Sequence, residues 1–324
     1  MVVEVTRNAF VESTHAIDVV IADASGSIHC TYGDQKKLIY PRSAIKSLQA
    51  LPLVESGASE AFGLEDKHLA LACSSHNGEA MHVECAAEIL DRAGLTPQCL
   101  QCGAQMPMLM ADQRSLIGEP GHIHNTCSGK HAGFLAFAAH AGLETKDYIS
   151  LQHPVQREIA SVLETITDHP HGQDNHGIDG CSIPTFTIPL EKLAIAYAKF
   201  GVGDDPNPAR SKAMLHIRDA CFAHPEMIAG KKRNCTRLMQ ALLGRAFVKY
   251  GAEGVYTASL PELGLGIALK ARDGASRSVD VAISYLCAQF LELNDEETTA
   301  MAPLLRPKLK NRNRIEIGQM QVAE

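Results

Sequence analysis

A serine and a lysine three residues apart, Ser43 and Lys46, have the types and the spacing needed for nucleophilic catalysis. Residues three apart lie above one another on a helix, and Ile45, Leu48 and Leu51 recur at helical spacing. A serine hydroxyl needs a base to take its proton, and a lysine serves only when burial or a second cation lowers its pKa. The pair therefore predicts a Ser-Lys nucleophile in a desolvated pocket; a capping serine followed by a solvated lysine is the alternative.

A second serine segment, residues 74–79, follows the short apolar run Leu69–Cys73. The run predicts a strand that delivers Ser75 to the start of a helix, where backbone N–H groups and hydroxyls come together. A capping sequence is the alternative. A Ser-His pair with His76 is less favoured, because there is no Gly-x-Ser-x-Gly elbow and adjacent strand residues face opposite ways.

Two cysteines and an aspartate from separate loops, Cys127, Asp179 and Cys181, have the donor types of a tetrahedral zinc site. Lys130 or His131 is the candidate for the fourth ligand, the lysine only as a neutral amine. Cysteines buried in the core without a metal are the alternative.

A late lysine, Lys249, precedes Gly251 at the start of a predicted strand. In that position its ammonium could lie beside Lys46 and supply the second cation that a lowered lysine pKa requires. A solvated lysine at the edge of a sheet is the alternative.

Composition is that of a folded, acidic chain. The chain has 324 residues, of which 45% are apolar, and its formal net charge of -7 argues against a nucleic-acid partner. No apolar stretch reaches the ~20 residues that span a bilayer, and the first residues do not resemble a signal peptide, so we expect no membrane partner and a cytoplasmic location. The ten cysteines are then expected to be reduced, and the single C-x-x-C, Cys99 to Cys102, is weak evidence for metal or redox chemistry.

Strands are predicted at both ends of the chain and helices between them. The predicted strands are 2–5, 16–22, 28–32, 254–259 and 264–271. The predicted helices are 43–56, 79–93, 129–141, 153–167, 190–200, 207–223, 235–248 and 276–293. This order predicts an α+β fold whose terminal strands share one sheet around a helical middle. The predicted division is a sheet-forming part at 1–42 and 249–293, a mostly helical part at 43–248 and an irregular C-terminal arm at 294–324.

Taken in order, the motifs resemble the class 3, rhizobial-type L-asparaginases of the asparaginase II family, which are similar in fold to serine β-lactamases and penicillin-binding proteins. The resemblance covers about residues 8 to 293. Its five motifs are Arg42–Lys46, Ser75–Glu79, Cys127–Gly133, Gly177–Cys181 with Pro184, and Gly251–Tyr256. It implies a serine β-lactamase-like fold, hydrolysis of L-asparagine to L-aspartate and ammonia, and a homodimer. Ser47, after the lysine, departs from the proline common in the family.

The resemblance also implies roles for individual residues. The implied catalytic residues are Ser43, Lys46 and Ser75, with Lys249 as a second lysine and Lys270 as its rival. The implied zinc ligands are Cys127, Lys130, Asp179 and Cys181. The candidates for binding the substrate's carboxylate and ammonium, chosen by position, are Arg42 and Glu79.

Other functions fit parts of the same pattern. A penicillin-binding-type peptidase or esterase would share the Ser-Lys pair. A cysteine amidohydrolase would use Cys127 with His131, although a thiol bound to a metal cannot also attack. A non-catalytic, zinc-stabilised binding protein is the third alternative.

Overall fold

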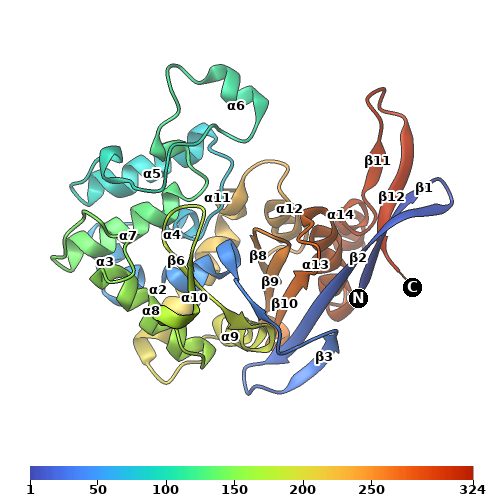
Figure 1. Cartoon of the computed structure of the whole chain (residues 1–324), viewed down its shortest axis with the longest axis horizontal. Coiled ribbons are helices and arrows are strands. Elements are labelled where there is room, and N and C mark those ends of the chain that lie inside the picture. Colours follow the sequence, from blue (N-terminus) through green and yellow to red (C-terminus); the bar gives the residue numbers. More distant parts are fainter. Residues whose placement is uncertain (324) are drawn as a thin grey trace. The chain divides into compact units, whose positions relative to one another are not determined.

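Strands from both ends of the chain form one antiparallel sheet, which confirms the predicted α+β architecture. The computed structural model describes residues 1–323. β1 (Val2–Arg7) pairs with β2 (Phe10–Asp23) on one side and with β12 (Glu316–Val322) on the other (Figure 1). The strand order is β11-β12-β1-β2-β10-β9-β8, and β3 also pairs with β2. The remaining bounds are β3 Ile28–Tyr32, β8 Phe247–Gly251, β9 Val255–Leu260, β10 Leu265–Ala271 and β11 Lys308–Lys310.

The described residues divide into two units. The sheet unit contains Met1–Ala44, Ile188–Gly201 and the residues from Arg237 onward, and the helical unit contains Ile45–Thr187 and Val202–Thr236. The segment 188–201, predicted in the helical part, thus lies in the sheet unit. Among residues 1–323, no helix combines the length and the apolar character needed to cross a membrane.

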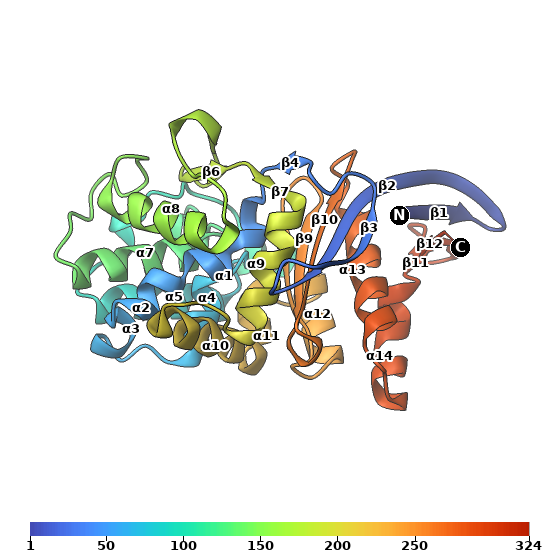
Figure 2. The same ribbon diagram turned by 90° about the horizontal axis from the view of Figure 1, so that it is seen from below.

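Two helices cover opposite faces of the sheet within the sheet unit, α9 (Leu190–Val202) and α13 (Ser276–Phe290) (Figure 2). α9 packs directly on β10, where a Cβ added to Gly266 would clash with the carbonyl oxygen of Ala194. α13 buries an apolar stripe with Val279, Ile283 and Leu286. The central strands β9 and β10 are buried almost throughout, so polar side chains on them need hydrogen-bond partners.

The helical unit is built around α7 (Ser128–His140), whose residues from Ser128 to Ala138 are all buried. A helix that is buried all round is central to its core. The other helices of this unit are α1 Lys46–Gln49, α2 Leu51–Glu55, α3 Ala58–Ala61, α4 Asp66–Ala72, α5 Ala80–Arg92, α6 Met110–Ser115, α8 Pro154–Thr167, α10 Pro208–Ala223 and α11 Pro225–Ala229. A short hairpin joins β5 (His176–Ile178) to β6 (Pro184–Phe186), and α12 (Asn234–Ala241) begins in this unit.

Two predicted helices are interrupted. The predicted helix 43–56 is a 3-10 helix, η1 (Arg42–Ile45), followed by α1 and then α2. Pro52 lies in the first turn of α2 and has no N–H to donate to the preceding turn, which explains the break. The predicted helix 235–248 ends at Ala241, and strand β8 begins at Phe247.

The predicted strand at 69–73 is wrong, because this run belongs to α4. Short apolar runs fit a buried helix as well as a buried strand, and this one is buried on all sides from His68 to Ala72. The helix start is marked by Glu65, whose N–H donates to Nδ1 of His68 at 2.9 Å.

The predicted irregular arm at 294–324 is also wrong for residues 294–323, and residue 324 lies outside the described residues. α14 (Asp295–Leu305) begins with a capping box, in which Asn294 accepts from the N–H of Glu297 at 2.8 Å and Glu297 accepts from the N–H of Asn294 at 3.0 Å. Pro303 lies inside α14. The sequence analysis did not predict this helix, because it treated proline as a residue that ends helices. β11 and β12 then extend the sheet.

Candidate active site

Lys46, the first residue of α1, is fully buried in the helical unit, and its Nζ lies within hydrogen-bond distance of three acceptors. These are the carbonyl oxygen of Ser74 at 2.5 Å, Oγ of Ser75 at 3.0 Å and Sγ of Cys127 at 3.1 Å. The structure thus brings together Lys46 and Ser75, and adds Cys127 to them. A lysine buried this deeply requires such partners.

The loop that carries Ser75 is held by backbone hydrogen bonds to two other segments. The N–H of Ser75 donates to the carbonyl of Ile228 at 2.9 Å, and that of His76 donates to the carbonyl of Thr126 at 3.1 Å. Ser75 is buried, with 8% of its surface exposed. The serine is therefore fixed next to the start of α7 rather than carried on a mobile loop.

The ring of His76 positions this loop and does not bond to Ser75. Its Nδ1 accepts from the N–H of Gly78 at 3.0 Å, so its Nε2 donates to Oγ of Ser128 at 2.9 Å. Burial, with the neighbouring His82, holds the pKa of His76 well below its usual value. The ring is therefore neutral and structural, which does not support a Ser75-His76 pair.

Cys127 and Cys181 lie between two lysines, Cys127 beside Lys46 and Cys181 beside Lys130. The thiol of Cys181, together with the charges of Lys46 and Lys130, lowers the pKa of Cys127 well below its usual value, and Cys127 and burial raise the pKa of Cys181. Lys130 Nζ donates to Sγ of Cys181 at 3.0 Å. We define Lys46, Cys127, Cys181 and Lys130 as the lysine-thiol cluster.

Lys130 is held as a cation by this cluster and by Asp179. Burial lowers the pKa of Lys130, but the charges of Cys181, Cys127 and Asp179 outweigh it, so the pKa is raised. Oδ2 of Asp179 lies 3.9 Å from Sγ of Cys181. Lys130 and Asp179 thus both lie beside Cys181.

The donor types of this group fit zinc, which favours thiolates and accepts nitrogen and carboxylate ligands. Within residues 1–323, however, no group of three or more His, Cys, Asp or Glu side chains has the arrangement of a metal site. A metal bound by these residues would require Lys130 to give up its proton. The donor types fit zinc, and the zinc itself stays a prediction.

His131, the other candidate for a fourth ligand, bonds elsewhere. The hydroxyl of Tyr148 accepts from the N–H of Gln101 at 3.0 Å and is hydrogen-bonded to Nδ1 of His131 at 2.6 Å. Burial, with the charge of Lys130, lowers the pKa of His131 well below its usual value. This neutral ring, tied to Tyr148, is not arranged as the base of a cysteine nucleophile.

Ser43 lies in η1 of the sheet unit and is half-buried. The residue before it, Arg42, has a φ of 52°, a left-handed conformation that side chains other than glycine rarely adopt. A strained residue next to a proposed nucleophile motivates a functional hypothesis, since strain persists only where the surroundings impose it.

The two candidate second lysines lie on the same face of the sheet but have different neighbours. Lys249 is buried and pairs opposite Thr257, whose hydroxyl donates to the carbonyl of Ala44 at 3.1 Å. Lys270 pairs opposite Val255 and donates to the carbonyl of Glu253 at 2.7 Å. Lys249 is therefore paired with Thr257, the residue that hydrogen-bonds to the segment of Ser43. This placement favours Lys249 over Lys270 as the second lysine.

Glu79 is engaged by its own chain. One carboxylate oxygen accepts from the N–H of Lys231 at 2.8 Å and from the side-chain amide of Asn77 at 3.1 Å. Burial raises the pKa of Glu79, but these bonds outweigh it and lower the pKa. These contacts are enough to account for a buried, ionised Glu79 that stabilises the fold. The binding of a substrate ammonium by Glu79, and of a substrate carboxylate by Arg42, stays a prediction.

Two residues that the sequence analysis did not single out, Ser128 and Tyr148, hydrogen-bond to the rings of His76 and His131. Ser128 lies inside the Cys127–Gly133 motif, which was the only signal available for it. Tyr148 lies in no motif. Its partner His131 is 17 residues away, so only the folded chain reveals the bond.

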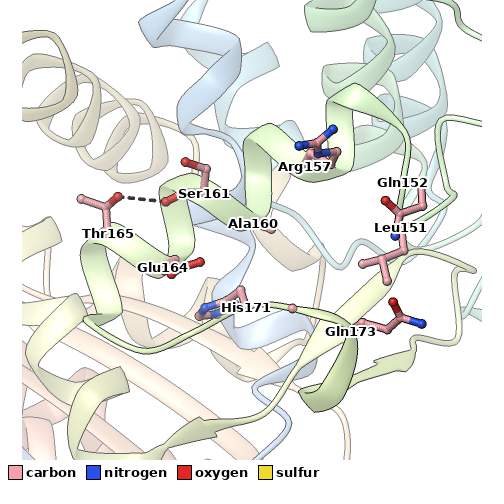
Figure 3. Close-up of a pocket in the computed structure, with 10 residues that line it drawn as sticks. Leu151, Gln152, Arg157, Ala160, Ser161, Glu164, Thr165, His171 and Gln173 are labelled. Carbon is pink, nitrogen blue, oxygen red and sulfur yellow. Dashed lines mark hydrogen bonds between the residues drawn. The ribbon is translucent and has the colours of Figure 1, made fainter.

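A cavity of 480 Å³ lies apart from these residues (Figure 3). Its walls are α8, with Arg157 and Glu164, and the segment that contains His171 and Gln173. The residues that line it are Leu151, Gln152, Arg157, Ala160, Ser161, Glu164, Thr165, His171, Gly172 and Gln173. The lysine-thiol cluster does not open into this cavity, so cavity size does not identify the candidate site.

Comparison with known protein families decides the identity. The family model for L-asparaginase II matches residues 3–322. This chain belongs to the L-asparaginase II family. No curated protein matches the sequence.

Among solved structures, this L-asparaginase II family member is similar to a class C β-lactamase, with 15% identity over 86% of this chain and 92% of that chain and a TM-score of 0.43. It is also similar to Mglu in its native form, with 13% identity over 86% of this chain and a TM-score of 0.40. The chain spans 65% of the length of Mglu, less than two thirds. These TM-scores are too low for either similarity to carry an argument about this chain.

Proposed function

We propose that this enzyme hydrolyses L-asparagine to L-aspartate and ammonia by acyl transfer through a serine, with Lys46 as the base. The observation that carries the proposal is the buried Nζ of Lys46, 3.0 Å from Oγ of Ser75 and 3.1 Å from Sγ of Cys127, in a chain of the L-asparaginase II family. A buried amine beside a serine hydroxyl is the pairing that activates a serine without histidine.

Ser43 is the proposed nucleophile, supported by its spacing from Lys46 and by the strained backbone at Arg42. Neutral Lys46 takes the hydroxyl proton as Oγ of Ser43 bonds to the side-chain amide carbon of the substrate. The carbon–nitrogen bond then breaks, and the leaving nitrogen takes the proton from Lys46 and departs as ammonia. Water adds to the acyl-serine, Lys46 takes one of its protons, and breaking of the ester bond returns that proton to Ser43 and releases L-aspartate.

Ser75 is the second candidate nucleophile, because its Oγ is the hydroxyl oxygen that Nζ of Lys46 contacts. In the favoured scheme Ser75 relays protons between Lys46 and the substrate, and Lys249 adds a positive charge near Ser43. Arg42 and Glu79 are the candidates for the substrate's carboxylate and ammonium.

Zinc is proposed as a cofactor, with Cys127, Lys130, Asp179 and Cys181 as the residues that would hold it. When bound, zinc would take up the negative charge of the thiols and could orient the substrate. The residues of the chain do the rest: Lys46 and Ser75 remain next to Cys127, and Ser43 attacks. The homodimer and the cytoplasmic location remain predictions.

The test is ammonia release from L-asparagine by the purified full chain, with L-glutamine and the β-lactam nitrocefin alongside. Release from L-asparagine that is lost in Ser43→Ala supports the proposal. Hydrolysis of nitrocefin without ammonia release would favour the penicillin-binding-type alternative, and no reaction with any of the three would favour a binding protein.

A further inference from the structure

The carbonyl oxygen of Ala44, directly after Ser43, accepts hydrogen bonds from two buried hydroxyls. One is the hydroxyl of Tyr197 on α9, and the other is Oγ1 of Thr257 on β9 at 3.1 Å. Both side chains are fully buried. Two elements that are far apart in the sequence thus fix one peptide group of the sheet unit.

A third contact comes from β8. A Cβ added to Gly251 would lie 2.5 Å from the carbonyl oxygen of Pro41 and 2.9 Å from the nitrogen of Ala44. Only glycine therefore lets this strand pack against the backbone on both sides of Ser43. Arg42, which lies between Pro41 and Ser43, has the left-handed φ of 52°.

These contacts explain how an unfavourable backbone conformation persists. A residue in the left-handed region relaxes unless its surroundings fix it, and backbone contacts on both sides do so here. The hydroxyls of Tyr197 and Thr257 approach the carbonyl of Ala44 from two different elements, and that of Thr257 lies closer to this carbonyl than to the carbonyl of Lys249, at 3.1 Å against 3.4 Å.

We propose that Tyr197 and Thr257 are positioning residues that set the orientation of Ser43 by anchoring the carbonyl of Ala44. This inference rests on the proposed function, in which Ser43 is the nucleophile. Neither side chain needs to touch the substrate. Their effect is on the attack itself, because a nucleophile misplaced by about 1 Å loses about 10²-fold in rate.

The test compares Tyr197→Phe, Thr257→Val and the double variant, each of which removes a hydroxyl and little else. We expect kcat for L-asparagine to fall about 10-fold in each single variant and about 10²-fold in the double, with KM changed less than about two-fold. Thr257→Ser restores a hydroxyl and should recover most of the lost kcat. The rate at which a small sulfonyl fluoride labels Ser43, followed by mass spectrometry, should fall in parallel.

Thr167→Val is the matched control. Thr167 is also buried and its hydroxyl also donates to a carbonyl, that of Leu163 at 2.7 Å, but in the helical unit on α8. This variant should keep its kcat and its labelling rate even if its melting temperature falls. If the double variant keeps full kcat, or if Thr257→Ser recovers nothing, the positioning role is wrong.

The same set of variants separates this inference from the proposed function. Turnover retained in Ser43→Ala would remove Ser43 as the nucleophile and with it the positioning role, while ammonia release lost in Ser75→Ala would keep the proposed hydrolysis with Ser75 as the nucleophile. An inactive Ser43→Ala together with an unaffected double variant would remove only the positioning role. If Thr257→Val fails to fold, the kcat and the labelling rate of Tyr197→Phe test the positioning role by themselves.

Discussion

Nζ of Lys46 lies 3.0 Å from Oγ of Ser75, across 29 positions of the sequence. The same nitrogen contacts Sγ of Cys127, so the proposed base and the proposed metal ligands belong to one hydrogen-bonded group. The surroundings of Lys46 thus include one proposed catalytic hydroxyl and one proposed zinc ligand.

Ser43→Ala should lower kcat for L-asparagine by at least about 10³-fold, because the attacking oxygen is lost. Its cost in unfolding free energy should be only about 0.5–2 kcal/mol, as for other serines at helix starts. Steady-state kinetics and urea denaturation check both numbers. Ser75→Ala is the matched variant: an inactive Ser75→Ala beside a Ser43→Ala with more than a few per cent of normal activity would move the nucleophile to Ser75.

Lys46→Met should be as inactive as Ser43→Ala, because without a base the hydroxyl keeps its proton. Loss of the ammonium also leaves the carbonyl of Ser74 unpaired, so we expect a loss of about 1–3 kcal/mol in unfolding free energy. Lys146→Met, at an exposed position, is the control for removing a lysine and should change neither quantity. An active Lys46→Met with an inactive Lys249→Met would assign the base to Lys249.

Zinc should bind at about one ion per chain, and its affinity should fall as the pH drops from about 8 to about 6. The pKa of Lys130 is raised, so a metal must displace a tightly held proton, and protons compete better at low pH. Metal analysis after dialysis, with circular dichroism to follow the fold, measures both, and Lys130→Met should bind zinc more weakly at every pH.

Chelation should raise KM for L-asparagine more than it lowers kcat, since no metal-bound water is needed by the proposed chemistry. An absence of zinc after growth in zinc-replete medium would remove the site. Complete loss of turnover at saturating L-asparagine, restored by added zinc, would instead make the metal catalytic and contradict the Ser-Lys scheme.

Asp18 should stabilise the sheet unit only above the pH at which it is protonated. Burial raises the pKa of its carboxyl, but the hydrogen bonds from Arg272 and Lys37 outweigh this and lower it. The folded pKa is thus below the unfolded value of about 3.9, so the stabilisation is present above about pH 4 and is lost as the pH falls through the folded pKa. Asp18→Asn should cost about 1–3 kcal/mol at neutral pH, because both cations stay partly exposed to solvent.

Urea denaturation of wild type and Asp18→Asn from neutral pH downward measures this effect. The difference between them should shrink toward zero in acid. Asp91→Asn, at an exposed position on α5, is the control and should match wild type throughout. A difference that does not change with pH would show that the ionised carboxylate is not the source of the stabilisation.

Motifs and strand patterns were enough to predict much of this molecule. Alternating β-branched residues predicted the sheet, and short motifs singled out Lys46, Ser75 and the ligand group of Cys127. What they could not predict was the contact of Lys46 with Cys127, since these residues are 81 positions apart and meet only through packing. Nor could a local pattern tell that the apolar run 69–73 is helical, because a fully buried run has no polar face to reveal its period.

The position of β2 has a consequence for how the chain acquires its fold. Its 14 residues pair with β1 at one end and with β3 and β10 at the other, and β1 pairs in turn with β12, Val5 opposite Met320. The pairings of β1 with β12 and of β2 with β10 join distant segments and form slowly, and during synthesis β1 and β2 emerge long before β10 and β12. We therefore expect the helical unit to collapse first on the ribosome, with the edges of β1 and β2 exposed to chaperones until the last strand has been made.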